Sequence, residues 1–232
     1  MSHKAGFVNI IGNANVGKST LMNALVGEKL SIITYKAQTT RHRVMGIVNG
    51  DDFQIIYSDS PGILHPQNKL HQQMMNAVSS ALNDADIFLL VTEVGESLKN
   101  EEVLNKVINS KVPVILVINK IDIANQEIIN EKITYWQNII PRAIIIPTCA
   151  IEKFNVDKIF AKIIELLPQN PPYFPKDSLT DKSMRFFASE IIREKILLLY
   201  KKEVPYSVEV VIENYNEGKD IDKIEAVIYV ER

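Results

Sequence analysis

The protein has 232 residues, of which 46% are hydrophobic and 23% are charged, with a formal net charge of −2. This is the composition of an ordinary globular protein, and the slightly negative charge excludes a global basic field that would draw the chain onto nucleic acid, although it leaves room for a local basic patch. The single cysteine, Cys149, excludes an internal disulfide, the apolar run near the N-terminus is too short for a signal peptide, and no segment has the ~18 uncharged apolar residues of a membrane span.

Short apolar runs alternate with helical patterns over the first two thirds of the chain. Runs rich in valine, isoleucine and leucine predict strands at 6–12, 41–49, 53–58, 86–93, 112–119 and 143–148. Helical patterns lie at 18–27, 70–82, 101–110, 127–140 and 156–167. This alternation predicts an α/β domain, 1–167, with a mostly parallel sheet covered by helices on both faces. The turn sequence NGDD at 49–52 predicts a hairpin, which would make one edge strand antiparallel.

A proline-rich segment separates this domain from a smaller unit. Four prolines within 168–177 predict an extended linker. Beyond it we expect an amphipathic helix at 183–200 and two strands, at 206–215 and 224–232. One helix and two strands bury little apolar surface, so we expect the unit 178–232 to be an incomplete α+β domain.

The sequence GNANVGKS, at 12–19, matches the pattern G-x-x-x-x-G-K-[ST] between a predicted strand and a predicted helix. Its glycines let the backbone wrap around phosphates with the N–H groups pointing inward, and the following helix N-terminus favours anions. In such a loop Lys18 reaches the β- and γ-phosphates and the Ser19 hydroxyl binds Mg²⁺. The predicted phosphate site comprises Gly12, Asn13, Ala14, Asn15, Val16, Gly17, Lys18, Ser19 and Thr20.

The sequence NKID, at 119–122, follows a predicted strand, where ligands of open α/β sheets bind. The Asp122 carboxylate suits the N1–H and N2–H donor pair of guanine, which adenine lacks, while Asn119 can meet the ring edge and the Lys120 stem can pack on the base. Cys149 and Ala150, in the sequence TCA, end the next strand and are predicted to make backbone contacts to the base.

The order of GNANVGKS, QTTR, DSPG, NKID and TCA resembles the translation-factor-like GTPases. The longer strings KAQTTRHR, at 36–43, and FFASEIIREKILLLYKKEVPYSVEV, at 186–210, resemble the Era family of ribosome-assembly GTPases, and this resemblance covers essentially the whole chain. It implies GTP, GDP and Mg²⁺ as ligands, 16S rRNA and the small (30S) ribosomal subunit as partners, and a monomeric cytoplasmic protein with peripheral contact to the cytoplasmic membrane.

The second domain of that family is a KH fold, whose G-x-x-G loop binds RNA. No such loop follows 224–232, so we expect 178–232 to be the N-terminal part of a KH-type domain. The family usually has Ser-Ala where this chain has Cys149-Ala150, and we expect little loss because those contacts are mainly made by the backbone.

The resemblance also implies two switch segments, Thr39–Thr40 and 59–63. Asp59 would hold Mg²⁺, through water, and the Gly62 N–H would sense the γ-phosphate, with Ser60 and Pro61 between them. Thr40 is the better candidate for the threonine on Mg²⁺ and Thr39 is the alternative; a pair of loop threonines with local hydrogen bonds is the plain structural interpretation.

Ile63 occupies the position at which many GTPases place a glutamine that orients water, so unassisted hydrolysis is expected to be slow. Related GTPases supply a potassium ion held by an asparagine of the phosphate loop, here Asn15, where it would stabilise developing charge. A turn residue chosen for its backbone conformation is an equally good interpretation of Asn15.

Two other functions fit parts of this pattern. A GTP-dependent binding module would use the nucleotide only to hold a conformation, and a nucleotide kinase would share the phosphate loop, although NKID and the lack of an arginine-rich lid disfavour the kinase. The helix at 183–200 and the residues after it carry basic side chains that predict either an RNA-facing edge or, preferably, the solvated face of a core helix: Arg185, Arg193, Lys195, Lys201 and Lys202.

Overall fold

The computed structural model describes residues 3–96, 100–200 and 208–230. Its larger part is a six-stranded sheet in the order β2-β3-β1-β4-β5-β6. The strands are β1 (Lys4–Ile11), β2 (Val44–Asn49), β3 (Phe53–Asp59), β4 (Ile87–Glu93), β5 (Val114–Asn119) and β6 (Ile144–Pro147). Neighbouring strands run parallel except β2, which pairs antiparallel with β3 at the edge. The predicted α/β fold with an antiparallel edge strand is confirmed.

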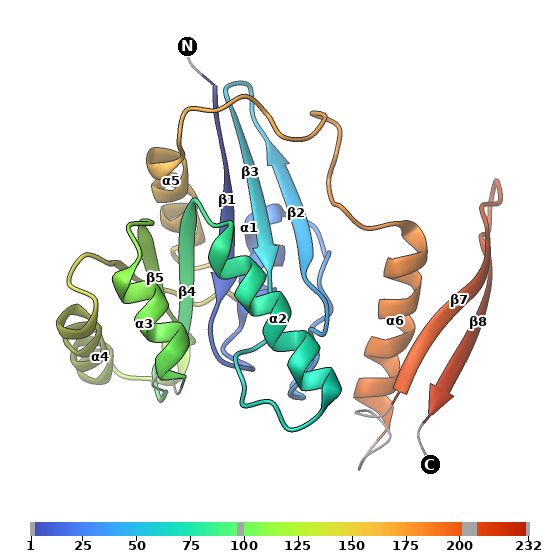
Figure 1. The fold of residues 1–232 in the computed structure, drawn as a ribbon, viewed down its shortest axis with the longest axis horizontal. Helices are drawn as coiled ribbons and strands as arrows, with labels where there is room; N and C mark the ends of the chain where they lie inside the picture. Colours follow the sequence, from blue (N-terminus) through green and yellow to red (C-terminus); the bar gives the residue numbers. More distant parts are fainter. Residues whose placement is uncertain (1–2, 97–99, 201–207, 231–232) are drawn as a thin grey trace.

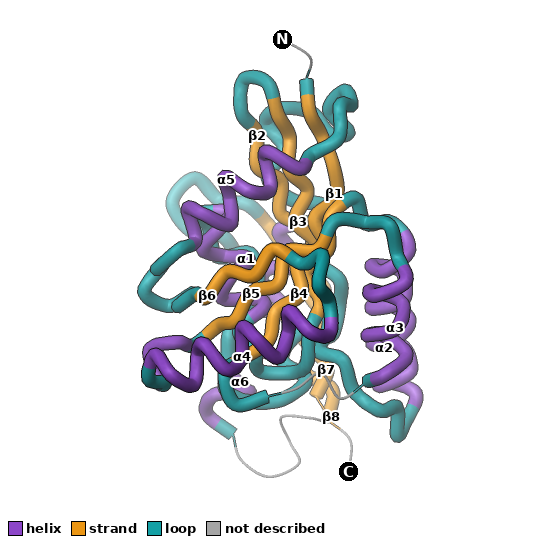
Figure 2. The backbone as a smooth tube through the Cα atoms, turned by 90° about the vertical axis from the view of Figure 1, so that its left-hand side faces the viewer, coloured by secondary structure: helices purple, strands orange, loops and turns teal. Residues whose placement is uncertain are grey.

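Helices cover both faces of this sheet, as Figure 2 shows for α1 and α5 on one side and α2 and α3 on the other. Their bounds are α1 (Lys18–Val26), α2 (Lys69–Asn83), α3 (Glu101–Asn109), α4 (Gln126–Ile139) and α5 (Val156–Leu166). Val8 and Ile10 of β1 pack with α1 and α5, whereas Ile11 packs with Val107 of α3 and Trp136 of α4. Alternate residues of the central strand thus supply two separate cores, which explains the continuous apolar runs in the sequence.

Local signals set the ends of several helices. Asn68, Asn100 and Asn125 precede α2, α3 and α4, and each side chain accepts a hydrogen bond from the backbone N–H three residues later. These caps satisfy N–H groups that have no partner within the helix. Gly27 ends α1 in the left-handed conformation, at φ 85°, which a residue without Cβ adopts easily.

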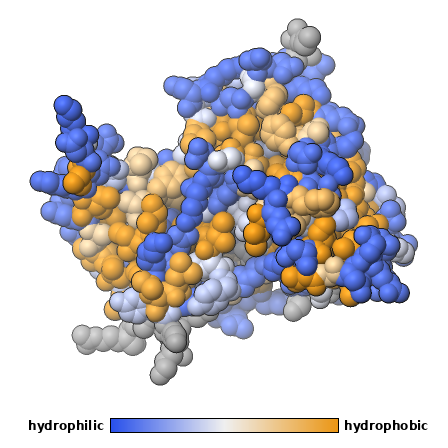
Figure 3. Space-filling model, turned by 180° about the vertical axis from the view of Figure 1, so that it is seen from behind, coloured by the Kyte–Doolittle hydropathy of each residue, from blue (hydrophilic) through white to orange (hydrophobic). Residues whose placement is uncertain are grey.

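The smaller part of the molecule consists of α6 (Met184–Leu199) and the antiparallel pair β7 (Val208–Asn216) and β8 (Lys223–Val230). Figure 1 shows α6 between the six-stranded sheet and this hairpin. Almost every residue of β8 is exposed, and apolar side chains gather on the surface of this part in Figure 3. Within the described ranges, no helix is long and apolar enough to cross a bilayer.

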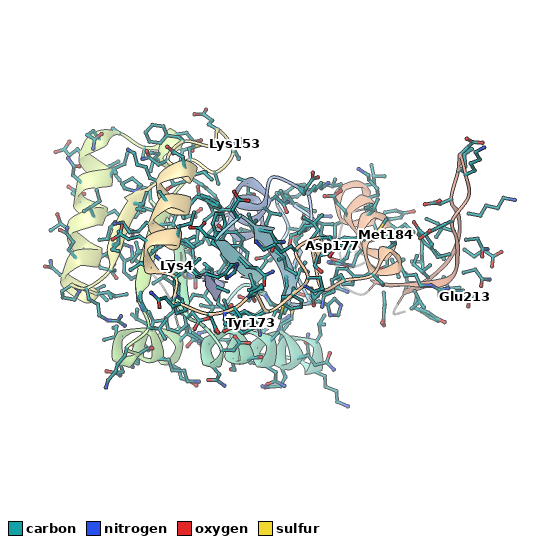
Figure 4. The ribbon with its side chains drawn as sticks, turned by 90° about the horizontal axis from the view of Figure 1, so that it is seen from above. Lys4, Lys153, Tyr173, Asp177, Met184 and Glu213 are labelled. Atoms are coloured by element: carbon teal, nitrogen blue, oxygen red, sulfur yellow. The ribbon has the colours of Figure 1, made fainter. Side chains whose placement is uncertain are left out.

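Residues 168–182, which we call the strap, join the two parts along the edge of the sheet. Gln54 of β3 is buried and its Oε1 accepts the N–H groups of Tyr173 and Phe174, at 2.7 and 2.9 Å. The Ile47 N–H of β2 donates to the Leu179 carbonyl at 2.8 Å. Figure 4 shows this course past Tyr173 and Asp177 to Met184. The proline-rich segment contains no helix or strand, and it is hydrogen-bonded to the strands beneath it.

Candidate functional site

A cleft of about 590 Å³ lies at the carboxyl ends of the parallel strands. Five segments far apart in the sequence line it: the loop after β1, the loop between α1 and β2, Gly62 after β3, and the loops after β5 and β6. The lining residues predicted from sequence are Ala14, Asn15, Gly17, Lys18, Ser19, Thr20, Thr39, Thr40, Gly62, Asn119, Lys120, Asp122, Cys149 and Ala150. The predicted phosphate, switch and base residues thus meet at one place.

The phosphate loop passes close to the base loop and leaves no room for a side chain at Gly17. Gly17 has φ 95°, and a Cβ there would lie 2.2 Å from Nδ2 of Asn119. The helix α1 begins at the next residue, so its unpaired N–H groups face the cleft. Gly12, Asn13 and Val16 of the same loop, which were also predicted here, are not among the residues that line the cleft.

Lys18 is a buried cation at the start of α1. Its Nζ donates to the Asn13 carbonyl at 2.6 Å. Burial lowers its pKa to about 8, against the opposing charges of Asp59 and Glu96. A desolvated ammonium group in a cleft is best stabilised by an anion, so the position suits a phosphate.

Three side-chain oxygens from three segments meet beside Lys18. Ser19 Oγ donates to Asp59 Oδ2 at 2.7 Å and lies 3.0 Å from Thr40 Oγ1. The other oxygen of Asp59 is buried and accepts no hydrogen bond from the part of the chain that the structure describes. Burial raises the pKa of Asp59, while the Ser19 hydrogen bond, the Lys18 charge and the nearby Ser31 hydroxyl lower it. Hard oxygen donors with an unsatisfied carboxylate oxygen are what Mg²⁺ prefers, so these residues fit that ion.

The two candidate switch threonines have different environments. Thr39 Oγ1 lies 2.7 Å from Thr34 Oγ1 and donates to the Lys36 carbonyl at 2.6 Å, so its hydroxyl is used within its own loop. Only Thr40 places its hydroxyl beside Ser19. The geometry therefore favours Thr40 over Thr39 as the metal-side threonine.

Ile63 lies outside the cleft. Its side chain is buried in a cluster with Val78 of α2 and Val103 of α3, and its N–H donates to the Gly12 carbonyl at 3.0 Å. Asp59, Ser60 and Pro61 are likewise buried below the cleft, and only Gly62 of this segment reaches it. A Cβ at Gly62 would lie 2.6 Å from the Ala14 Cα, so this backbone touches the phosphate loop closely.

The base loops are tied together by Asn119. Its Nδ2 donates to the Val16 carbonyl at 2.9 Å, and its Oδ1 accepts the Ala150 N–H at 3.0 Å. Lys120 has φ 60° and forms an ion pair with Glu93, and both Lys120 and Asp122 line the cleft. Cys149 is buried, and burial raises the pKa of its thiol, so it stays protonated.

Several residues that line the cleft were not predicted from the sequence. Ile123 and Ile151 follow NKID and TCA directly and are 72% and 79% exposed, so their apolar side chains flank the cleft mouth. An isoleucine directly after each base-loop signal was the available clue. The other missed residues lie just before QTTR or at its first position: Ile32, Ile33, Thr34, Tyr35 and Gln38.

Arg193 corrects the prediction of a solvated or RNA-facing basic edge. Its side chain is 4% exposed, because α6 presents it to the loop between α1 and β2 instead of to solvent. Arg185 is exposed, as predicted, and so is Lys195. Lys201 and Lys202 lie outside the described residues.

Known proteins share this sequence and this fold. The family model described as "50S ribosome-binding GTPase" matches residues 7–120. GTPase Era of Syntrophus aciditrophicus is 42% identical over 99% of this chain and 76% of its own length, and GTPase Era of Staphylococcus epidermidis is 40% identical over 99% and 78%. The chain belongs to the Era family of GTPases. It is a P-loop GTPase of the kind that the resemblance predicted.

Solved Era structures extend the match through α6 and the hairpin. Era in complex with MgGDPNP and nucleotides 1506–1542 of 16S ribosomal RNA has a TM-score of 0.92 and 37% identity, covering 99% of this chain and 80% of that one. An Aquifex aeolicus Era variant bound to GDP and AlF4⁻ has the same TM-score with 38% identity and the same coverage. This chain therefore shares the family fold from the first strand to β8.

Proposed function

We propose that this chain is a nucleotide switch that binds GTP and GDP with Mg²⁺, hydrolyses GTP slowly, and acts on the small ribosomal subunit through 16S rRNA. The observation that carries the proposal is that Lys18, Ser19, Thr40 and Asp122 line one cleft, with the buried Asp59 carboxylate hydrogen-bonded to Ser19 beneath it. In this reading 1–167 is the GTP-binding domain, 168–177 the linker, and 178–232 the N-terminal part of a KH-type domain.

Guanine recognition falls to the loops after β5 and β6. The Asp122 carboxylate accepts the N1–H and N2–H donors of the base, and adenine has no matching pair. The exposed side chains of Ile123 and Ile151 cover apolar surface of the bound base. Asn119 holds these loops against the phosphate loop, as its two hydrogen bonds support.

Phosphate and metal binding fall to the start of α1. Lys18 exchanges the Asn13 carbonyl for phosphate oxygens, and its charge is then fully compensated. Ser19 and Thr40 would hold Mg²⁺ directly and Asp59 through water. When bound there, Mg²⁺ supplies charge neutralisation across the β- and γ-phosphates.

Hydrolysis is proposed to be slow because the Ile63 side chain is buried away from the cleft and cannot orient water. A monovalent cation is the proposed aid. Asn15 Nδ2 donates to the Tyr35 carbonyl at 3.2 Å, so an amide of the phosphate loop and a carbonyl of the loop between α1 and β2 lie together. Their oxygens suit K⁺, which would stabilise charge that develops in the transition state.

The RNA half of the proposal rests on the family. A relative of 37% identity was solved with nucleotides 1506–1542 of 16S ribosomal RNA, and α6 and the hairpin of this chain match that protein. We accordingly propose 16S rRNA and 30S assembly as the target, in the cytoplasm as a monomer, with peripheral membrane contact as a further expectation.

The test is depletion of the native protein from its cell, followed by sucrose-gradient analysis of ribosomal particles. The proposal expects free small subunits and intact ribosomes to fall, with rescue by wild type and none by Lys18→Ala. Phosphate release from GTP by the purified protein tests the enzymatic part. Tight GTP binding with no release would favour the alternative, a GTP-dependent binding module.

A further inference from the structure

The loop between α1 and β2, residues 27–43, contains no helix or strand, yet it supplies one wall of the cleft. We call it the switch loop. An irregular loop keeps one conformation only if outside contacts compensate for the entropy of ordering it. The partners of the switch loop are therefore informative about how the site is assembled.

Arg193 of α6 holds the switch loop at the residue before Thr40. Its Nη2 donates to the Thr39 carbonyl at 2.5 Å. The Glu190 carboxylate accepts from its Nε at 2.7 Å and from its Nη2 at 2.5 Å, which fixes the guanidinium plane. A buried, oriented arginine thus grips the peptide that carries the hydroxyl beside Ser19.

Glu194 holds the same loop nearer to its start, at Lys29 and Ile33. Its Oε1 accepts the Ile33 N–H at 3.2 Å and its Oε2 accepts from Lys29 Nζ at 2.8 Å. Burial acts to raise the pKa of this carboxyl, but the hydrogen bonds from Lys29 and Ile33 and the charges of Lys29 and Lys195 hold it below its ordinary value. Glu194 therefore remains ionised and bound.

Two further contacts reinforce this docking. Lys36 Nζ donates to the Tyr200 carbonyl at 2.5 Å, just after α6, and Arg41 Nη1 donates to the Val208 carbonyl at 2.6 Å, at the start of β7. All five contacts join residues more than 150 positions apart in the chain. The switch loop is consequently attached to the smaller part of the molecule at several points along its length.

We infer that Arg193 and Glu194 are positioning residues for GTP hydrolysis: α6 holds the switch loop so that Thr40 stands beside Ser19 and Asp59. This inference rests on the proposed role of Thr40 at Mg²⁺. Loss of either residue should therefore affect GTP binding more than GDP binding. The phosphate and base loops that would hold GDP contact neither Arg193 nor Glu194, whereas binding of the triphosphate with Mg²⁺ needs the ordered switch loop. By linkage, the triphosphate in turn favours the docked position of α6.

The experiment compares Arg193→Ala and Glu194→Ala with wild type in three measurements: the Kd for GDP, the Kd for a non-hydrolysable GTP analogue over a Mg²⁺ titration, and the single-turnover rate with GTP. We expect GDP affinity within about twofold of wild type and a loss on the order of tenfold in Mg²⁺-dependent analogue affinity or in rate. Arg193→Lys should recover part of the loss. The matched control is Arg185→Ala on the same helix, which removes an exposed side chain whose Nη1 meets only the Glu213 carbonyl, at 3.2 Å, away from the switch loop.

A double-mutant cycle with Thr40→Ala distinguishes positioning from a general loss of stability. If Arg193 acts through Thr40, the analogue-binding losses of Arg193→Ala and Thr40→Ala do not add. Additive losses, or wild-type values for both α6 variants, overturn the inference. If Arg193→Ala also loses GDP, Glu194→Gln takes its place in the cycle, because it preserves side-chain shape. A wild-type protein that fails to bind GTP with Mg²⁺ would instead refute the proposed function itself.

Discussion

The Asn119 side chain donates to the Val16 carbonyl at 2.9 Å, so a residue at the end of β5 fastens the phosphate loop that follows β1. The same amide accepts the Ala150 N–H after β6 at 3.0 Å. One buried side chain therefore fixes the distance between the phosphate end and the base end of the cleft. Asn119 therefore holds the loops of the cleft together, in addition to its proposed contact with the base.

Asn119→Ala should consequently lower both stability and nucleotide affinity. It leaves the Val16 carbonyl and the Ala150 N–H unpaired in a buried place, at a cost of about 1–3 kcal/mol. Chemical denaturation of the nucleotide-free protein measures the first effect and titration with GDP measures the second. An unchanged unfolding midpoint would contradict the architectural role.

Asp122→Asn should exchange guanine for xanthine preference. The amide matches the altered edge of xanthine, and the variant loses the carboxylate that accepts two donors from guanine. Because hydrogen bonds to charged groups are worth ~1.5–3 kcal/mol each, we expect a loss of about a hundredfold in GTP affinity. Competition between GTP, XTP and ATP provides the measurement, and equal wild-type affinity for ATP and GTP would refute the assignment.

Ser19→Ala should weaken the response to Mg²⁺. Loss of an outer-shell partner typically costs 10–100-fold in metal affinity, and loss of a direct ligand should cost at least about that much. The Mg²⁺ concentration at half-maximal hydrolysis is the quantity to compare, with GDP binding in EDTA as the control. Full magnesium-stimulated turnover in this variant would argue against the Ser19–Asp59–Thr40 site.

Ile63→Ala should affect folding more than chemistry. The side chain packs with Val78 and Val103, so its truncation should cost about 2–5 kcal/mol of stability. It has no group that polarises water, so hydrolysis at a temperature where the variant is folded should stay within about tenfold, or ~1.4 kcal/mol in barrier. Single-turnover rates together with a melting curve test both halves. A large rate loss in a fully folded variant would mean that Ile63 has a catalytic role after all.

Potassium should accelerate hydrolysis relative to sodium, on the order of tenfold, if Asn15 and the Tyr35 carbonyl hold a cation. Asn15→Ala should abolish the difference while GDP binding survives. Matched potassium and sodium buffers at constant ionic strength are sufficient for the comparison. Equal rates in the two salts for wild type would move the search to the residues around 38–43 or to a ribosomal partner.

Much of the site was predictable because its signals are local. GNANVGKS and NKID each predict a local backbone conformation and the chemical group that it binds, within a few residues. The alternation of strands and helices places both motifs at the same edge of the sheet. The environment of Ile63 was predicted only in part. Its lack of a polar group is visible in the sequence, but its burial between α2 and α3 depends on packing.

The environment of Arg193 could not be predicted, because it depends on contacts across more than 150 residues. A basic residue on an amphipathic helix usually faces solvent, and periodicity alone gives no sign of a distant carbonyl that needs a donor. The assignment of Thr40 over Thr39 as the metal-side threonine likewise depends on the folded structure. It was decided by which hydroxyl the folded loop brings to Ser19.

The strap keeps α6 close to the switch loop and so favours the contact between them. Because Gln54, Ile47 and Met45 fasten residues 173–181 to the sheet, only two residues remain between the last anchored point, Asp181, and the first residue of α6. The effective concentration of α6 at the switch loop is therefore high. If the two separate, the tether keeps them close, so that α6 binds the loop again in an intramolecular step. An insertion between Asp181 and Met184 would dilute this local concentration and loosen the switch loop without altering any residue that touches it.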